Sequence, residues 1–313
     1  MTRGKELRKM LSNGQVFAPC VWDCVSAKAA QMAGFNAILL SGGTYASFCC
    51  GFPDIGLFTQ DDLVRQSELI CDYVDIPVIV DADEGYGESA VTTYRLAKRL
   101  ARVGAAAFTI EDSTGIKGYN RWSYFIANSL ADGTVEHPVV SQDSWLSKLK
   151  AGLDATSGTD CMLIARTEAK IGYGVEEAIE RACKAQELGV EMVLVMGMLT
   201  QEDAEKVAKY VKGWKMWPDV QSHNGVPDVI IKNIETLGYN LVTTHIFERA
   251  CLASMVDVGR HVKDSEQTVY ADNYSIAGMD KKVGAAFSKV DPWLEKEAGW
   301  IREAKLISEN RRK

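Results

Sequence analysis

Charged side chains come directly after three separate apolar segments of this chain. The first segment is followed by Asp81 and Asp83, the second by Glu111 and the third by Arg166. If these segments are parallel strands, their carboxyl ends meet at one edge of a sheet or barrel, where such folds place their chemistry. Clustered carboxylate oxygens are the ligands that Mg²⁺ prefers. The pattern therefore predicts a divalent-cation site, with Mg²⁺ as the expected metal and Mn²⁺ as its substitute.

Further groups at strand ends suit a small anionic substrate. Ser41, Gly42 and Gly43 follow another apolar segment, and glycines there let backbone N–H groups approach an anion closely. Arg166 offers a bidentate fork for a carboxylate or a phosphonate. His245 follows the last expected strand. Together these groups suit a di-anionic substrate whose developing enolate oxygen is held by Mg²⁺.

Two of these residues also have a purely structural interpretation. Arg166 could form an ion pair with Glu168, two residues further along the chain. His245 either faces the site or is a hydrogen-bonded packing residue. The histidines of the chain show no spacing typical of metal ligands, so we expect no histidine-bound metal.

Eight short apolar segments are expected to be the strands that position these groups. They are residues 16–18, 37–40, 78–81, 107–110, 162–165, 192–195, 216–220 and 241–244. Their length and weak alternation are typical of buried parallel strands, and amphipathic helical patterns lie between them. The sequence therefore predicts an α/β fold, a (β/α)8 TIM-type barrel, with residues 1–313 as a single domain.

Two segments do not fit the repeat of strands and helices. Residues 113–140 form a long connection after the fourth strand, and long connections in compact domains are usually functional. We therefore expect a gating loop there. Residues 285–313 are expected to form a helical tail. Because this tail carries Trp293 and Trp300, it has more apolar surface than a solvated helix needs, and it should pack on another surface.

The overall composition excludes several classes of protein. The 313 residues are 47% hydrophobic and 25% charged, as in ordinary soluble proteins. The net charge of -7 and the lack of a basic stripe argue against a nucleic-acid partner. No apolar segment approaches the roughly 20 residues that span a bilayer, and the first residues do not resemble a secretory signal. We expect a cytoplasmic protein with reduced cysteines and no membrane association.

The motifs in this chain resemble those of the phosphoenolpyruvate mutase/isocitrate lyase superfamily over about residues 7–253. The matching motifs are residues 19–27, 33–37, 41–43, 53–56, 81–87, 111–112 and 165–169. In the most specific motif, Asp-Ala-Asp-Glu-Gly-Tyr-Gly, Glu84 stands where Thr is usual. The resemblance implies that Asp81 ligates Mg²⁺ directly. It implies that Asp83 and Glu111 hold the ion directly or through water.

The same resemblance implies roles for the other matched positions. Residues 41–43 should bind the substrate carboxylate, and Arg166 should bind its second anionic group. Asp54 should line the site near the reacting centre. The resemblance also implies a C-terminal helix that is swapped between the subunits of a dimer or tetramer, with a homotetramer as the expected assembly.

The gating loop departs from the patterns that separate the subfamilies. Lyases that cleave isocitrate or methylisocitrate carry Lys-Lys/Arg-Cys-Gly-His, but here only Lys117 is in register and Tyr119 stands near the missing Cys. Mutases and phosphonopyruvate hydrolases carry Glu-Asp-Lys-x-x-Pro-Lys, but here Ser113 replaces the first Lys and Ile116 the Pro. After the sixth strand, Met196 stands near the position of the lyase Glu and the mutase His.

The expected function is that of a Mg²⁺-dependent lyase. It would cleave a C–C bond of a small 2-hydroxy or 2-oxo dicarboxylic acid, of the malate or oxaloacetate type, through a pyruvate-like enolate. The candidate catalytic residues are Asp54, Lys117, Tyr119 and Arg166, with Lys117 or Tyr119 as a general acid from the loop. Two alternatives stay open. One is P–C bond chemistry, as in phosphoenolpyruvate mutase or phosphonopyruvate hydrolase, and the other is a non-catalytic barrel that binds a small acid.

Overall fold

The computed structural model describes most of the chain. The described residues are 1–114, 139–197, 200–220, 222–223, 226–227, 231–274 and 290–310. Internal contacts divide the chain into two units, Met1–Glu248 and Arg249–Lys313, which are described separately below. None of the helices within the described ranges combines the length and hydropathy that a membrane span requires. The assignment of residues 1–313 to one domain stays a prediction.

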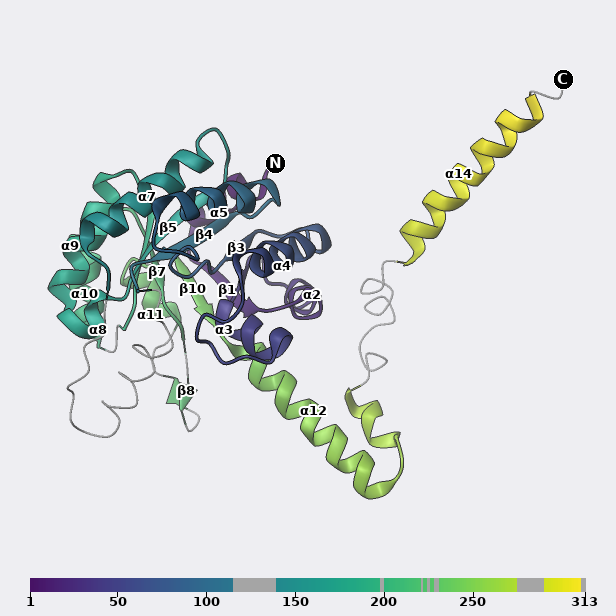
Figure 1. The fold of residues 1–313 in the computed structure, drawn as a ribbon. Helices are drawn as coiled ribbons and strands as arrows, with labels where there is room; N and C mark the ends of the chain where they lie inside the picture. Colours follow the sequence, from purple (N-terminus) through teal and green to yellow (C-terminus); the bar gives the residue numbers. More distant parts are fainter. Residues whose placement is uncertain are drawn as a thin grey trace. The chain divides into compact units, whose positions relative to one another are not determined.

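The first unit contains a closed barrel of eight parallel strands (Figure 1). The strands are β1 (Val16–Val21), β2 (Ile38–Leu40), β3 (Val78–Val80), β4 (Ala107–Glu111), β5 (Met162–Thr167), β6 (Met192–Val195), β7 (Trp214–Trp217) and β10 (Leu241–Thr244). Each strand pairs with its neighbour along the chain, and β1 pairs with β10 to close the circle. The predicted TIM-type barrel is therefore confirmed.

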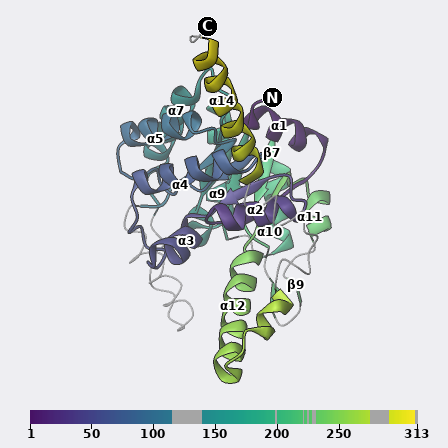
Figure 2. The same cartoon turned by 90° about the vertical axis from the view of Figure 1, so that its right-hand side faces the viewer.

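Helices connect the strands and surround the barrel (Figures 1 and 2). They are α1 (Arg3–Asn13), α2 (Cys24–Met32), α3 (Gly42–Tyr45), η1 (Ala46–Cys50), α4 (Gln60–Tyr73), α5 (Ala90–Arg102), α7 (Gln142–Thr156), α8 (Ala169–Tyr173), α9 (Val175–Glu187), α10 (Gln201–Tyr210) and α11 (Ile231–Thr236). The local sequence determines where several of these helices begin. Asp23 and Thr59 each accept a hydrogen bond from a backbone N–H of the first turn that follows, which satisfies a donor that has no partner within the helix. A short hairpin, β8 (Ser222–His223) and β9 (Val226–Pro227), lies outside the barrel sheet.

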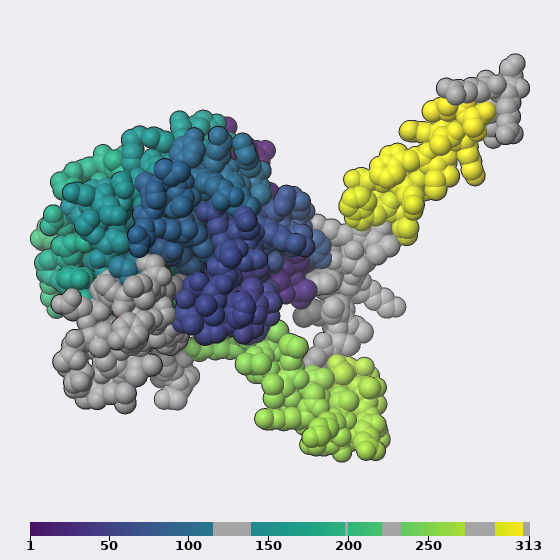
Figure 3. Space-filling view, viewed as in Figure 1, coloured from purple at the N-terminus to yellow at the C-terminus, as the bar shows by residue number. Residues whose placement is uncertain are grey.

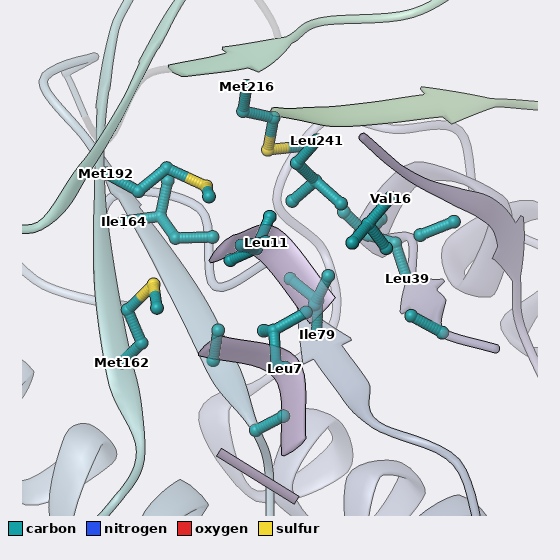
Figure 4. Packing of buried hydrophobic residues seen from close by; sticks show 14 of the residues in the cluster. Leu7, Leu11, Val16, Leu39, Ile79, Met162, Ile164, Met192, Met216 and Leu241 are labelled. Carbon is teal, nitrogen blue, oxygen red and sulfur yellow. The ribbon is translucent and has the colours of Figure 1, made fainter. Parts of the chain in front are cut away.

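Helix α1 closes the amino end of the barrel. Its Leu7 and Leu11 are buried among apolar side chains from the beginnings of the strands, including Val16, Met162 and Met192 (Figure 4). Removing this apolar surface from water stabilises the packing by about 25 cal/mol per Å². Because α1 fills the amino end, the carboxyl ends of the strands are left as the place for a site.

The second unit contains helices without a sheet among its described residues. Most of α12 (Ile246–Ser265), the 3-10 helix η3 (Val269–Tyr274) and α14 (Val290–Asn310) belong to it. Helix α14 confirms the expected C-terminal helix, and it is drawn in yellow in Figure 3. The side chains of Trp293 and Trp300 are 64% and 61% exposed. The exchange of this helix between subunits stays a prediction.

Candidate active site

The loop after β3 adopts a strained backbone that brings carboxylates to the barrel mouth. Asp83 and Tyr86 have positive φ angles of 46° and 58°, which non-glycine residues rarely adopt away from functional sites. Gly85 has no room for a side chain, since a Cβ there would lie 2.6 Å from the Thr93 hydroxyl oxygen. The Tyr86 hydroxyl donates to Asp83 Oδ2 at 3.4 Å, and the Glu111 N–H donates to the Asp83 carbonyl at 2.9 Å. The loop is therefore held from β4 and lies close against α5.

Arg166, at the end of β5, lies among three carboxylates. Its Nη1 is 3.2 Å from Asp81 Oδ1 and its Nε is 3.1 Å from Glu111 Oε2. Its Nε also donates to Glu168 Oε1 at 2.9 Å, and its Nη2 contacts the same oxygen. Burial acts to lower the pKa of Arg166, but the carboxylates outweigh burial and hold the pKa well above its usual value. Arg166 is therefore a permanent, buried positive charge that is fixed by its partners.

The predicted metal-ligand carboxylates are held by hydroxyl groups as well as by Arg166. Thr109 Oγ1 donates to Asp81 Oδ1 at 2.9 Å, and Ser113 Oγ donates to Glu111 Oε1. These hydrogen bonds fix the orientation of each carboxylate on its own strand. The three ligands proposed from the sequence are thus brought to the same end of the barrel, from β3 and β4.

The donor set suits a hydrated Mg²⁺ ion. In the part of the chain that the structure describes, no three His, Cys, Asp or Glu side chains are grouped closely enough to enclose a metal by themselves. Mg²⁺ usually keeps several waters and takes only one or two carboxylates from the protein. Among the described residues, Asp81, Glu111 and Glu168 contact one guanidinium, that of Arg166, so carboxylates outnumber the cation there. An open oxygen-rich site of this kind fits Mg²⁺ better than a closed cage.

The residues 41–43 lie against two acidic side chains. A Cβ at Gly42 would lie 3.4 Å from Asp83 Oδ2, and a Cβ at Gly43 would lie 2.9 Å from Asp54 Oδ2. Glycine at position 43 therefore allows Asp54 to approach the backbone. The structure places Asp54, which the sequence predicts to line the site, next to Gly43. It places Asp83, in the loop after β3, next to Gly42. The predicted substrate-binding segment thus borders the predicted metal site.

On the other side of residues 41–43, a histidine is held between a serine and an aspartate. His245 Nε2 is 3.2 Å from Ser41 Oγ, and His245 Nδ1 is 3.1 Å from Asp219 Oδ2. Thr44 Oγ1, one turn after Ser41, donates to Glu248 Oε2 at 2.9 Å. His245 is therefore in contact with the predicted carboxylate-binding segment, as the sequence-based hypothesis requires. Its role in binding substrate stays a prediction.

Asp112 connects the site to the base of the expected gating loop. Its carboxylate accepts hydrogen bonds from the Glu168 N–H and the Thr167 hydroxyl, both at 2.7 Å, and from Arg181 Nη1 at 3.2 Å. Burial raises the pKa of Asp112 to about 6 despite these partners. Arg181 also donates to the carbonyl of Val140 at 2.9 Å, which fixes the end of the loop. Asp112 therefore braces β4 against β5 and α9.

The two loop residues proposed as acids lie outside the described residues. Ser113 and Val139 form an isolated antiparallel bridge, so the two ends of the gating loop lie side by side. Residues 115–138 are not described, and Lys117 and Tyr119 are among them. Their roles stay predictions.

Three residues that support the site were not among the candidates. Asp219 lies two residues after the end of β7, but the expected strand ran to residue 220, so the strand-end signal did not mark it. Thr109 points inward from β4, as alternate residues of a barrel strand do. Lys148, on α7, is buried and donates to the carbonyl of Glu84 at 3.0 Å. Nothing in the local sequence of α7 marks Lys148, because its partner is distant in the chain.

The sequence matches known proteins along most of its length. A profile of the phosphoenolpyruvate phosphomutase family matches residues 7–263. The 2,3-dimethylmalate lyase of Eubacterium barkeri is 28% identical over 274 residues, which cover 86% of this chain and 89% of that protein. The 2-methylisocitrate lyase of Escherichia coli is 36% identical over 164 residues, about half of each chain. An oxaloacetate decarboxylase of Rhodopseudomonas palustris is 32% identical over 203 residues, covering 64% and 66%.

A solved structure agrees with the sequence matches. A crystal structure of 2,3-dimethylmalate lyase superposes with a TM-score of 0.79 at 25% identity and covers 96% of this chain and 99% of that one. The barrel fold, the carboxylates at the strand ends and the profile match over residues 7–263 all indicate the same family. The chain belongs to the phosphoenolpyruvate phosphomutase family, within the phosphoenolpyruvate mutase/isocitrate lyase superfamily.

Proposed function

We propose that this protein is a Mg²⁺-dependent lyase that cleaves a C–C bond of a small 2-hydroxy or 2-oxo dicarboxylic acid. The observation that carries the proposal is the arrangement of Asp81, Asp83 and Glu111 beside Arg166, with residues 41–43 adjacent. Cleavage next to a carboxylate leaves negative charge on the fragment that keeps the bonding electrons. A site that stabilises this charge lowers the barrier.

Each group of residues in the site would have a separate role in binding or catalysis. Residues 41–43 would bind one carboxylate of the substrate through backbone N–H groups and the Ser41 hydroxyl. Arg166 would attract the second anionic group, and Asp54, next to Gly43, would line the reacting centre. When bound by Asp81 and its neighbours, Mg²⁺ would supply a positive charge that stabilises a developing oxyanion. Lys117 or Tyr119 would donate a proton from the gating loop.

The charges at the barrel mouth favour a dicarboxylate over a tricarboxylate. Arg181 is bound to Asp112, and Lys148 is bound to a backbone carbonyl. Arg166 already contacts three carboxylates. Among the described residues, Arg181 and Lys148 are thus committed to partners within the protein, and Arg166 would attract the second anionic group. A third substrate carboxylate would therefore gain little from these cations. We therefore expect an acid of the malate or oxaloacetate type, which is also the kind of substrate named for two of the relatives.

A substrate panel tests the proposal directly. Purified protein would be mixed with Mg²⁺ and with oxaloacetate, 2,3-dimethylmalate, isocitrate, methylisocitrate or phosphonopyruvate. The release of pyruvate, of glyoxylate from isocitrate, or of phosphate from phosphonopyruvate would be measured. We expect turnover of one of the first two acids and loss of turnover when EDTA removes the metal. Mg²⁺ in solution also accelerates the decarboxylation of oxaloacetate. The rate measured with the Asp81→Ala variant therefore serves as the background rate.

Each outcome of the panel distinguishes one alternative. Release of phosphate from phosphonopyruvate alone would replace C–C cleavage with P–C chemistry. Efficient cleavage of isocitrate or methylisocitrate would contradict the preference for small acids. Binding of Mg²⁺ without turnover of any acid would favour a non-catalytic barrel.

A further inference from the structure

A continuous series of hydrogen bonds joins residues that follow three strands of the barrel. Asp219 follows β7, His245 follows β10 and Ser41 follows β2. Strand β10 pairs with β7 on one edge and with β1 on the other. The contacts run from Asp219 Oδ2 to His245 Nδ1 at 3.1 Å and from His245 Nε2 to Ser41 Oγ at 3.2 Å. The barrel thus brings these three residues together although 178 to 204 positions separate Ser41 from the other two.

The number of hydrogen bonds that Ser41 can make limits what its hydroxyl can do. A serine hydroxyl has one hydrogen to donate and two lone pairs that accept. The N–H of Thr44 already donates to Ser41 Oγ at 3.3 Å, which uses one lone pair. The partner of the Ser41 hydroxyl hydrogen then depends on the His245 ring. If His245 Nε2 carries a hydrogen, Nε2 donates to the second lone pair of Ser41 Oγ. The hydroxyl hydrogen of Ser41 is then left for another acceptor.

The surroundings of His245 determine which ring nitrogens carry hydrogens. An ionised Asp219 can only accept, so Nδ1 must carry a hydrogen in either charge state of the ring. Burial acts to lower the pKa of His245, but the contacts with Cys20 and Asp219 outweigh burial and raise the pKa above its usual value. Burial also raises the pKa of the Cys20 thiol, so the contact between His245 Nδ1 and the Asp219 carboxylate is the one that favours a positive ring. Among the described residues, Asp81 is a further charged group that acts on Cys20, and Glu248, on α12, is bonded to Thr44.

We propose that Asp219 and His245 are positioning residues that hold Ser41 as a hydrogen-bond donor to the substrate carboxylate. In this arrangement, His245 donates through both nitrogens, to Asp219 and to Ser41, and Ser41 donates to the substrate. The positive ring also adds attraction for an anion beside residues 41–43. The inference rests on the proposed function, because it takes these residues as the carboxylate-binding segment. It adds that the segment selects an ionised acid rather than a neutral amide or ester.

The opposite arrangement would give Ser41 a different role. With a neutral ring, Nε2 would accept the Ser41 hydrogen, and the three residues would resemble a nucleophile activated by a base. Ser41 would then have no hydrogen for the substrate. The charge state of His245 therefore decides between a group that binds an anion and a group that attacks a carbonyl.

Nuclear magnetic resonance of the histidine rings tests this charge state. The chain has four histidines, so the His245 ring can be assigned by its absence from the His245→Gln spectrum. We expect hydrogens on both ring nitrogens at pH 7.5 in the wild type. In Asp219→Asn, the carbonyl oxygen can still orient the ring but the negative charge is lost, so the pKa should fall toward about 6.5. A neutral His245 in the wild type at pH 7.5 would overturn the proposal.

Binding of oxalate, the smallest dicarboxylate, provides the second measurement. Calorimetric titration in the presence of Mg²⁺ should show about tenfold weaker binding to His245→Gln, since a charge-assisted contact is lost. Asp219→Asn should weaken binding as well. The double variant should bind no more weakly than His245→Gln, because residues that act as a unit do not have additive effects.

A second histidine–aspartate pair in the chain provides the matched control. His261 Nδ1 lies 3.3 Å from Asp257 Oδ1 on α12, where both side chains are more exposed. The variants His261→Gln and Asp257→Asn make the same chemical changes there and should leave the oxalate affinity unchanged. Unchanged affinity in His245→Gln, or additive effects in the double variant, would contradict the inference alone. A wild type that binds no oxalate with Mg²⁺ would contradict the proposed function itself.

Discussion

Replacing Arg166 with methionine tests how the charges of the site are balanced. The Arg166 side chain is only 7% exposed and contacts Asp81, Glu111 and Glu168. Methionine fills a similar apolar volume but leaves these carboxylates without the guanidinium. Removal of one partner from a buried ion pair typically costs about 3–5 kcal/mol, because the remaining charge stays buried. We expect the free energy of unfolding of Arg166→Met to fall by about this amount in metal-free buffer.

Mg²⁺ should restore part of this stability. Arg166 repels a bound cation, so without its positive charge the carboxylates attract the cation more strongly and should bind it more tightly. A ligand at 100 times its Kd stabilises the folded state by about 2.7 kcal/mol. The difference between the variant and the wild type should therefore narrow when Mg²⁺ is present. Urea unfolding followed by tryptophan fluorescence, with and without Mg²⁺, measures both effects.

Arg181→Met is the matched control for this experiment. Arg181 is 8% exposed and pairs with Asp112 and Glu177, away from Asp81 and Asp83. Its removal should also destabilise the protein, but Mg²⁺ should then stabilise the variant only as much as it stabilises the wild type. The reasoning fails if Arg166→Met loses less than about 1 kcal/mol, or if Mg²⁺ affects both arginine variants equally.

Three further predictions concern the metal, the gating loop and the tail. Asp81→Ala should abolish binding of Mg²⁺ in calorimetric titration while the circular dichroism spectrum stays native, and an unchanged affinity would contradict its role as a ligand. Tyr119→Phe and Lys117→Met should each lower kcat more than they raise KM, and full activity in both would exclude a loop acid. Removing residues 290–313 should lower the oligomer mass in light scattering, because Trp293 and Trp300 would no longer pack on a neighbouring subunit. An unchanged mass would exclude this role.

The sequence by itself determined the barrel and the charged residues at the ends of β3, β4 and β5. Eight buried apolar segments with helical patterns between them leave few alternatives to a closed parallel sheet, and the structure confirms it. The carboxylates could be recognised because each comes directly after its strand, and parallel strands bring their carboxyl ends together. Asp81, Asp83, Glu111 and Arg166 are therefore near one another for a reason that is local in the sequence.

The tertiary structure alone decided which side chains contact these groups. Lys148 reaches Glu84 because α7 packs beside the β3 loop, and His245 meets Ser41 because the last strand closes the barrel against the first. The sequence left His245 open between a site residue and a packing residue. Hydrogen bonds act over about 3 Å, whereas a sequence pattern indicates only the strand to which a residue belongs. Closure of the barrel is what brings side chains from different strand ends within hydrogen-bonding distance of one another.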